Sequence, residues 1–200
     1  MIKIACIVEG HAEVAAFPIL LRRIGQWRSP ETYVEVQKPI RVNRDRFLNR
    51  QQEFSRHLQL ARAKAGDNGW VVVLLDADDD CPAELGPNVL LRAQDSIPQC
   101  LVSVVFANRE YESWFVGSAK SLDGIRGFVF DQSQLPQSAE GPRDAKGWVG
   151  KQIRNGHYGE TTLQPAFTAC FDLAMAEKNC RSFRKLCREW DRHAPMAGTD

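Results

Sequence analysis

Acidic side chains follow three predicted strands, at the point where each strand ends. In chain order these acids are Glu9, Asp76, Asp78, Glu110 and Glu112. Because parallel strands deliver their carboxyl ends to one edge of a sheet, we expect the carboxylates to lie close together. Converging carboxylates repel one another unless a cation neutralises them, and oxygen ligands without a His or Cys pair favour Mg²⁺ or Mn²⁺ over zinc. The pattern therefore predicts a magnesium or manganese site.

The pair Asp76 and Asp78 comes directly after the strongest strand signal of the chain, residues 70–75. In an extended segment, side chains two residues apart point the same way, so we expect the pair to hold one metal or to bridge two. Asp also starts turns and caps helices, and the pair on its own fits a simple turn equally well. Asp79 and Asp80, just ahead of Cys-Pro, we interpret as turn residues.

The first acid belongs to a V-E-G-x-x-E pattern. Gly10 lets the backbone turn sharply, Glu9 projects over the sheet edge, and Glu13 faces back from the first helical turn. Glu13 has an equally good interpretation as an acid that meets the positive N-terminus of the helix. His11 lies inside the pattern, where it can contact a substrate or simply cap the helix.

Basic side chains near the acids are candidates for contacting a substrate phosphate. Lys146 follows a long loop that can fold over the acids, and it is our candidate catalytic lysine. Arg109 stands beside the acids that follow the third strand, which makes it a candidate substrate-binding residue. Lys151 we interpret as an ordinary surface base.

The elements that must position these residues alternate between strands and helices. Apolar runs predict strands over 2–8, 32–36, 70–75 and 101–106. Helical spacing of apolar residues predicts helices over 12–25, 43–65, 88–95 and 113–120, and a last helix with Phe183, Leu186, Cys187 and Trp190 on one face. This alternation favours an α/β fold, a mostly parallel sheet flanked by helices with a helical C-terminal extension. We expect a metal-binding core over 1–122, with the loop and helices of 123–200 packed on the same domain.

Four local features of the sequence modify these predicted elements. Pro18 in the first helix indicates a kink or a later start. The helix over 43–65 has an Arg-rich face that can follow a phosphate backbone, although a solvated helix face explains it as well. Residues 123–147 are rich in Gly, Ser, Gln and Pro and predict a long, partly irregular loop. The tail 194–200 is expected to fray.

Composition fits one soluble domain with a substantial core, since 44% of the 200 residues are hydrophobic. The 26 basic and 25 acidic residues leave a net charge of +1, so overall charge neither indicates nor excludes nucleic acid. We find no apolar run of ~18 residues and no signal peptide, and we expect no membrane association. Six cysteines without a C-x-x-C pair favour free thiols and a cytoplasmic setting.

V-E-G-x-x-E after the first strand, combined with D-x-D after a later one, resembles the Toprim domain. That domain occurs in topoisomerases, bacterial primases, recombination proteins and the overcoming-lysogenisation-defect nucleases. The whole chain also resembles a small Toprim-like bacterial family of unknown function, encoded beside AAA or ABC-type ATPases. This wider resemblance rests on E-Y-E-S-W-F at 110–115 and on Ser182-Phe183. The Toprim motifs cover about the first half of the chain, and the glycine toward which many D-x-D motifs continue is replaced here by further acids.

The resemblance implies roles for individual residues. It makes Glu9 the Toprim glutamate that acts as acid/base or metal ligand. It makes Asp76 and Asp78 the metal-binding pair and Glu13 the second acid of the nuclease branch, and we add Glu112 to the same metal set. It further implies a Mg²⁺-dependent nuclease subunit that cleaves phosphodiester bonds, with DNA as the expected substrate. An ATPase partner would come from another chain, in phage defence or a similar system, since this sequence has no Walker-type phosphate loop.

The same acidic residues are compatible with two other classes of function. A non-catalytic Toprim-fold interaction module of an ATPase complex would keep the acids for structure or for weak metal binding. A receiver-like phosphoacceptor also gathers acids at strand ends, but acids after three strands and a paired D-x-D fit that class poorly.

Overall fold

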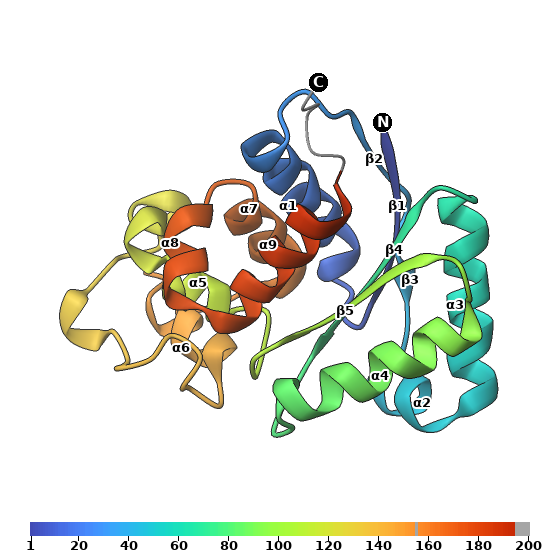
Figure 1. Cartoon of the computed structure of the whole chain (residues 1–200). Coiled ribbons are helices and arrows are strands. Elements are labelled where there is room, and N and C mark those ends of the chain that lie inside the picture. The colour runs from blue at the N-terminus through green and yellow to red at the C-terminus, as the bar shows by residue number, and fades with distance from the viewer. Residues whose placement is uncertain (155, 195–200) are drawn as a thin grey trace.

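The computed structural model describes residues 1–154 and 156–194, and it contains a five-stranded parallel sheet. The strands are β1 (Ile2–Val8), β2 (Val34–Val36), β3 (Ile40–Arg41), β4 (Trp70–Asp76) and β5 (Leu101–Ala107). Their order is β2-β1-β4-β5, and β3 pairs with the end of β1. β1 begins at the N label of Figure 1 and runs toward the lower edge of the sheet, where the parallel strands end. The predicted parallel α/β fold is confirmed.

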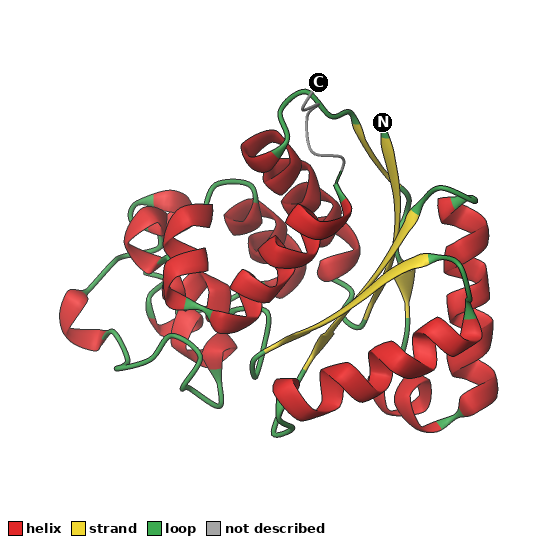
Figure 2. Ribbon diagram, in the orientation of Figure 1, coloured by secondary structure: helices red, strands yellow, loops and turns green. Residues whose placement is uncertain are grey.

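Helices cover both faces of the sheet (Figures 1 and 2). The α-helices are α1 (Glu13–Arg28), α2 (Arg44–Asn49), α3 (Gln51–Ala65), α4 (Pro82–Ser96), α5 (Ser113–Gly117), α6 (Ala145–Lys151), α7 (Glu160–Thr168), α8 (Leu173–Asn179) and α9 (Arg181–His193). In Figure 1, α2, α3 and α4 lie on one side of the sheet, and α1 lies with α5 to α9 on the other. Within the described residues, each helix is too short or too polar to cross a membrane.

The alternation of side chains along the central strands explains the layers. On β1, Ile4 and Cys6 belong to the core under α1 and the C-terminal helices, whereas Ala5 and Ile7 belong to the core under α3 and α4. Because helices cover both faces, β1 and β4 are apolar at nearly every position. The first core extends to Ala194, so the C-terminal helices and the sheet bury their apolar residues together.

The prediction of one helix over 43–65 is wrong. Arg50 is extended, with φ −112° and ψ 103°, and it divides the segment into α2 and α3. The rings of Phe47 in α2 and Phe54 in α3 lie 4.8 Å apart, centroid to centroid, so the break lets both rings fill one core. Arginine is a good helix former, and the apolar spacing alone therefore did not reveal the break.

The first helix also differs from its prediction, because α1 passes through Pro18 and ends at Arg28 instead of near Gly25. Gly25 lies inside the helix, where Val34 and Trp190 pack directly against it. A Cβ at this position would come within 2.7 Å of Val34 Cγ2 and 3.0 Å of the Trp190 ring. This glycine therefore permits close packing and does not end the helix.

Other boundaries shift by smaller amounts. The strand predicted over 32–36 is shorter, and the short β3 that follows it was not predicted. α4 begins at Pro82, earlier than predicted, because proline suits the first turn of a helix. The helix predicted over 113–120 is α5 followed by a 3-10 turn, and the loop 123–147 holds two further 3-10 turns and the start of α6. Fraying was predicted for 194–200: Ala194 is buried against the core, and 195–200 lie outside the described residues.

A buried hydrogen-bond chain joins α5 to α9. Trp114 Nε1 donates to Ser182 Oγ at 2.8 Å, and Ser182 Oγ donates to Glu140 Oε1 at 2.5 Å. Phe183 packs edge-on against the Trp114 ring, with centroids 5.2 Å apart. The tryptophan of the E-Y-E-S-W-F segment and the Ser-Phe pair therefore contact each other, and their role is packing.

Replacing Ser182 by Ala is expected to lower the free energy of unfolding by about 1–3 kcal/mol, because Trp114 Nε1 and Glu140 both lose a buried partner. Denaturant unfolding measures the change, with exposed Ser138→Ala as the matched control. Equal stability of the two variants would contradict the structural role of this chain of hydrogen bonds.

Candidate active site

Three adjacent strands bring acids to one edge of the sheet. Glu9 follows β1, Asp76 is the last residue of β4, and Glu112 lies beyond β5 at the start of α5. β4 is the neighbour of both β1 and β5. The edge lies at the bottom of Figure 1, between α2 on one side and α6 on the other. Parallel pairing thus collects acids that lie far apart in the chain.

Asp76 is held by backbone contacts at the centre of this edge and is only partly exposed. Its Oδ1 accepts a hydrogen bond from Tyr111 N at 2.9 Å, and its backbone carbonyl accepts one from Arg44 Nε at 2.9 Å. Burial, followed by the charges of Glu13 and Glu112, raises the pKa of Asp76 well above its usual value. A nearby cation would favour the ionised form of such a carboxyl group.

Glu13, the first residue of α1, faces back toward the end of β1. Its Oε2 accepts a hydrogen bond from Gly10 N at 2.5 Å, and its side chain is buried. A Cβ at position 10 would lie 2.8 Å from Glu13 Oε1, so a larger residue there would force the Glu13 carboxylate to shift. Burial raises the pKa of Glu13, although the hydrogen bond from Gly10 opposes the shift.

Glu9 is half-buried beside Glu13, and its Oε2 is buried without a hydrogen bond. Burial, followed by the charges of Asp78 and Glu13, raises the pKa of Glu9 to about 7. Arg44 and Lys146 oppose this rise because their positive charges favour the carboxylate. Glu9 can therefore exchange a proton near neutral pH, which suits an acid/base group or a metal ligand.

Glu112 is fully buried and is fixed by side chains from the C-terminal third of the chain. Its Oε1 accepts hydrogen bonds from Tyr158 Oη at 2.9 Å and from Gln164 Nε2 at 3.0 Å. Its Oε2 is buried and makes no hydrogen bond. Burial raises the pKa of Glu112 to about 7, against the opposing charge of Lys146.

Lys146 supplies the positive charge of this cluster from α6. Its Nζ lies 3.3 Å from Glu160 Oε2, and its backbone N donates to Glu110 Oε2 at 2.8 Å. Burial disfavours the lysine charge, but the carboxylates of Glu112, Asp76 and Glu160 outweigh it and raise the pKa of Lys146 above its usual value. The lysine is therefore protonated, and it partly balances the surrounding acids.

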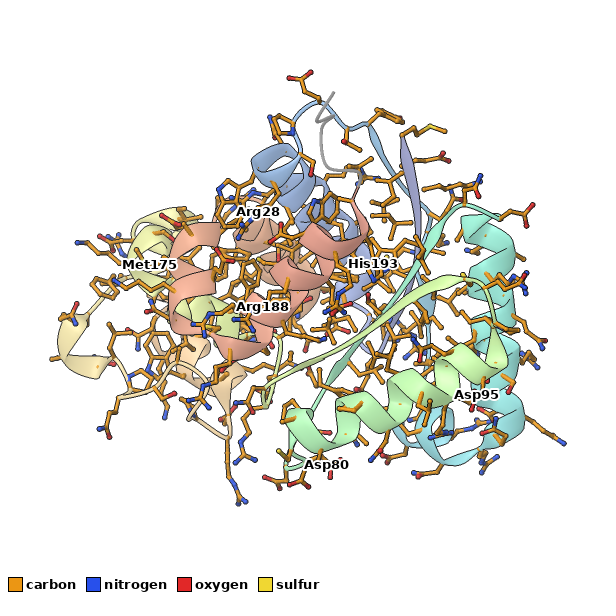
Figure 3. The ribbon with its side chains drawn as sticks, viewed as in Figure 1. Arg28, Asp80, Asp95, Met175, Arg188 and His193 are labelled. Atoms are coloured by element: carbon orange, nitrogen blue, oxygen red, sulfur yellow. The ribbon has the colours of Figure 1, made fainter. Side chains whose placement is uncertain are left out.

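Asp78 is arranged differently from the D-x-D expectation. β4 ends at Asp76 and Asp78 adopts φ 51°, so the assumption of an extended segment is wrong. The Asp78 side chain is exposed, and its Oδ2 lies 3.7 Å from Arg44 Nε. Arg44 Nη2 also donates to Asp80 Oδ2 at 2.5 Å. Figure 3 shows Asp80 near the start of α4, at the same lower edge. Asp78 lies at the rim of the cluster, and its charge acts on Glu9.

The two candidate substrate-binding residues, Arg109 and His11, are each close in the sequence to acids of the cluster. Arg109 Nη1 donates to the carbonyl of Asp78 at 3.0 Å and to Asp79 Oδ1 at 2.5 Å. Its side chain therefore holds the loop after β4, and it remains about one quarter exposed, at 28%. His11 is exposed in the turn between β1 and α1.

The side chains of the cluster are of the chemical type that a hard divalent cation takes as ligands. Its acids supply only oxygen ligands, and Glu9 Oε2 and Glu112 Oε2 are buried without the partner that a cation would provide. Within the part of the chain that the structure describes, no three His, Cys, Asp or Glu side chains form a ready-made ligand set. Lys146 and hydrogen bonds hold the acids in this arrangement.

Sequence reasoning missed several members of the cluster. Tyr158, Gln164 and Glu160 come from the C-terminal third, and no local motif marks them. The sequence pattern placed Arg44 only on a basic helix face. In the structure its side chain is 10% exposed and donates to the carbonyls of Asp76 and Ala77, where the loop after β4 begins. Long-range contacts of this kind leave no periodic signal in the sequence.

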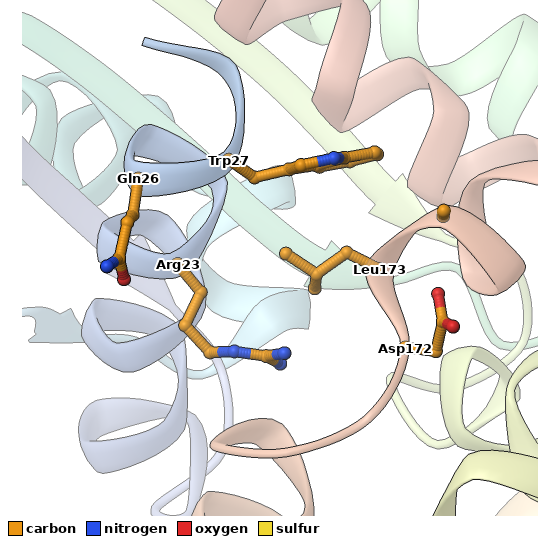
Figure 4. Close-up of a pocket in the computed structure, with 6 residues that line it drawn as sticks. Arg23, Gln26, Trp27, Asp172 and Leu173 are labelled. Atoms are coloured by element: carbon orange, nitrogen blue, oxygen red, sulfur yellow. The ribbon is translucent and has the colours of Figure 1, made fainter. Parts of the chain in front are cut away.

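A separate hollow of about 370 Å³ lies between α1 and α8, and no acid of the cluster lines it. Figure 4 shows Arg23 extending from α1 toward the loop that carries Asp172, below Trp27. Arg23 Nη1 and Nη2 donate to the carbonyls of Thr168 and Phe171, both at 2.8 Å. The arginine is thus already used to tie α1 to the C-terminal helices.

Comparison with known proteins adds a family but no activity. Neither the curated proteins nor the solved structures contain a match to this chain. A family match covers residues 8–190, from the end of β1 to the last turns of α9, and so includes every acid of the cluster. The chain belongs to the family described as Domain of unknown function (DUF4276).

Proposed function

We propose that this chain is a Mg²⁺-dependent nuclease subunit of the Toprim type, which hydrolyses phosphodiester bonds of DNA together with an ATPase partner. The observation that carries the proposal is the cluster itself. Acids from three strand ends and from α1 surround one lysine, and two of their buried oxygens lack a hydrogen bond. Structural ion pairs rarely leave such oxygens without partners, whereas a metal site requires them.

Glu9, Asp76 and Glu112 would hold the ion, with Glu13 and the rim residue Asp78 as further oxygen donors. Bound Mg²⁺ or Mn²⁺ supplies charge neutralisation at the phosphate and lowers the pKa of water. Lys146 adds a fixed positive charge for the extra negative charge that develops during phosphodiester cleavage. His11 and Arg109 would orient the substrate, and the exposure of both side chains supports this role.

The central test combines magnesium titration with a cleavage assay. By calorimetry, Glu9→Gln is expected to weaken Mg²⁺ binding roughly tenfold or more, because one charged ligand becomes neutral. Divalent-dependent cleavage of plasmid DNA should fall at least ~100-fold. The matched control is Asp95→Asn, an exposed acid at the far end of α4 from Asp80 (Figure 3). Wild-type metal binding in Glu9→Gln would refute the proposed site.

A non-catalytic interaction module is the alternative, and one observation favours it. Lys146, Tyr158 and Gln164 already bind the acids, so the cluster can serve to join the C-terminal helices to the sheet. This function predicts little heat of Mg²⁺ or Mn²⁺ binding and no cleavage, with or without an ATPase partner.

The ATPase partner is testable separately from the metal. The sequence has no phosphate-binding loop of its own, so nucleotide hydrolysis must come from another chain. Cleavage that needs added ATPase and ATP, in addition to Mg²⁺, would support the partnership. Full activity of the purified chain alone would show that no partner is required.

A further inference from the structure

A second hollow, of about 330 Å³, lies beside β3, between that strand and the helices α2 and α3. Its charged lining consists of Arg41, Arg46, Arg56 and a single acid, Glu53, with His57 beside them. In a chain whose net charge is only +1, three arginines in one hollow are a marked local excess of positive charge. This composition favours an anionic ligand.

Two of the three arginines are free to meet such a ligand. Arg46 Nη2 donates to Glu53 Oε1 at 2.6 Å, and Arg50 approaches the same oxygen at 3.5 Å, so the one acid is already occupied. Arg41 and Arg56 are exposed, and neither forms an ion pair within the described residues. Their guanidinium groups are therefore available to an anion from outside the chain.

The hollow adjoins the candidate active site through β1. Arg41 pairs with Val8 in parallel register, and Val42 N donates to the Val8 carbonyl at 2.9 Å. Glu9 is the next residue after Val8, and neighbouring strands lie ~4.8 Å apart. Arg44, from the same short segment, reaches the end of β4. Figure 1 shows β3 and α2 beside the lower end of β1. The hollow therefore lies next to the end of β1 that leads into Glu9, although no acid of the cluster lines it.

We propose that this hollow binds a backbone phosphate of the nucleic acid whose scissile bond lies at the neighbouring acids. The inference rests on the proposed function, because it identifies the substrate group that would be held beside the metal site. The planar guanidinium group of arginine can donate two hydrogen bonds to two phosphate oxygens, so Arg41 and Arg56 would both bind one phosphate. Contacts to the backbone position a strand without reading its sequence, and this site would accept many sequences.

The test is oligonucleotide binding, measured by fluorescence anisotropy in EDTA so that no metal contributes. The double variant Arg41→Gln and Arg56→Gln should bind a labelled strand of about 20 nucleotides roughly tenfold more weakly. The slope of log K against log salt should become shallower by about 1–2, since fewer counterions are released. The control is Arg22→Gln with Arg62→Gln, which removes the same charge from exposed positions outside the hollow.

Equal affinities and equal salt slopes of the two double variants would overturn the proposal. A pyrophosphate titration separates a strand from a free phosphate. If the Arg41→Gln and Arg56→Gln double variant loses pyrophosphate binding but still binds the oligonucleotide as wild type does, the hollow serves a free phosphate. That result would also overturn the proposal. The nuclease assignment fails on different results. If the wild-type chain binds the strand through Arg41 and Arg56 but binds no Mg²⁺ and cleaves no DNA, the phosphate site is supported and the nuclease function is refuted.

Discussion

Asp76→Asn is expected to abolish Mg²⁺-dependent cleavage and, at the same time, to make the metal-free protein more stable. The metal would lose a central charged ligand, and we expect the cleavage rate to fall at least ~1000-fold. Asn keeps the oxygen that accepts the hydrogen bond from Tyr111 N. It also removes an ionisable group that lies among Glu13 and Glu112.

The sign of the stability change follows from the pKa of Asp76. The folded protein raises this pKa, so it binds a proton more tightly than the unfolded chain does. The stability that this proton confers is complete below the ordinary Asp value, near ~4, and is lost as pH rises through the folded-state pKa. Above the ordinary Asp value, folded wild type must either keep this proton or bury a charge, and both lower its stability, whereas the Asp76→Asn variant does neither.

Thermal unfolding in EDTA at about pH 8 measures the stability, and a DNA cleavage assay with Mg²⁺ measures the rate. Asp95→Asn is the control for both, because it removes an acid that is exposed on α4. A melting temperature below that of wild type would mean that Asp76 is a stabilising structural acid. Cleavage at the wild-type rate would exclude it as a metal ligand.

Lys146→Met is expected to show the opposite stability change, with a fall of about 1–3 kcal/mol near pH 8. Its cation is only partly exposed among Glu112, Asp76 and Glu160, and Met preserves much of the packing. Removing one partner from a buried pair costs about 3–5 kcal/mol, and we lower that figure because the lysine reaches solvent. The loss of a fixed positive charge should also reduce cleavage.

This loss of stability should shrink as the pH falls. Glu9 and Glu112 both have a pKa of about 7, so they take up protons between about pH 8 and 6 and then need less positive charge nearby. Chemical denaturation of wild type and Lys146→Met at about pH 8 and pH 5.5 measures the two differences in unfolding free energy. Lys151→Met, at an exposed position on the same helix, is the control. A difference that does not depend on pH would mean that Lys146 acts through packing alone.

The two variants together separate the proposed functions. In a metal-dependent nuclease, Asp76→Asn and Lys146→Met both lose activity, although they shift stability in opposite directions. In a non-catalytic module, the same stability changes occur, but wild type and both variants bind Mg²⁺ at most weakly and cleave no DNA. The stability measurements therefore report on the electrostatics of the cluster, and the metal titration reports on its use.

Much of the architecture could be predicted from local patterns. Residues 70–75 are apolar at every position, because a central parallel strand is covered on both faces. The same reasoning located β1 and β5, and with them the edge where Glu9, Asp76 and Glu112 lie. The turn at Gly10 and the backward direction of Glu13 also follow from local chemistry, since glycine leaves room for the Glu13 carboxylate beside the Gly10 backbone.

Tertiary structure alone decided how these acids are neutralised and which of them are buried. Arg50 breaks a helix that its own propensity favours, because Phe47 and Phe54 both reach one core. Asp78 lies beyond the end of β4 with a positive φ, at the rim of the acid cluster, where its side chain is next to Arg44.

The contacts made by the C-terminal third of the chain were also decided by tertiary structure and not by local sequence. Tyr158 and Gln164 fix Glu112 across roughly fifty residues of sequence, at separations of 46 and 52. Strand and helix formation depends on neighbours along the chain, so the sequence by itself determined the parallel sheet and the position of the acids at its edge. Burial and charge at that edge depend on segments that meet only after folding, and for that reason only the tertiary structure decided the partners of each acid.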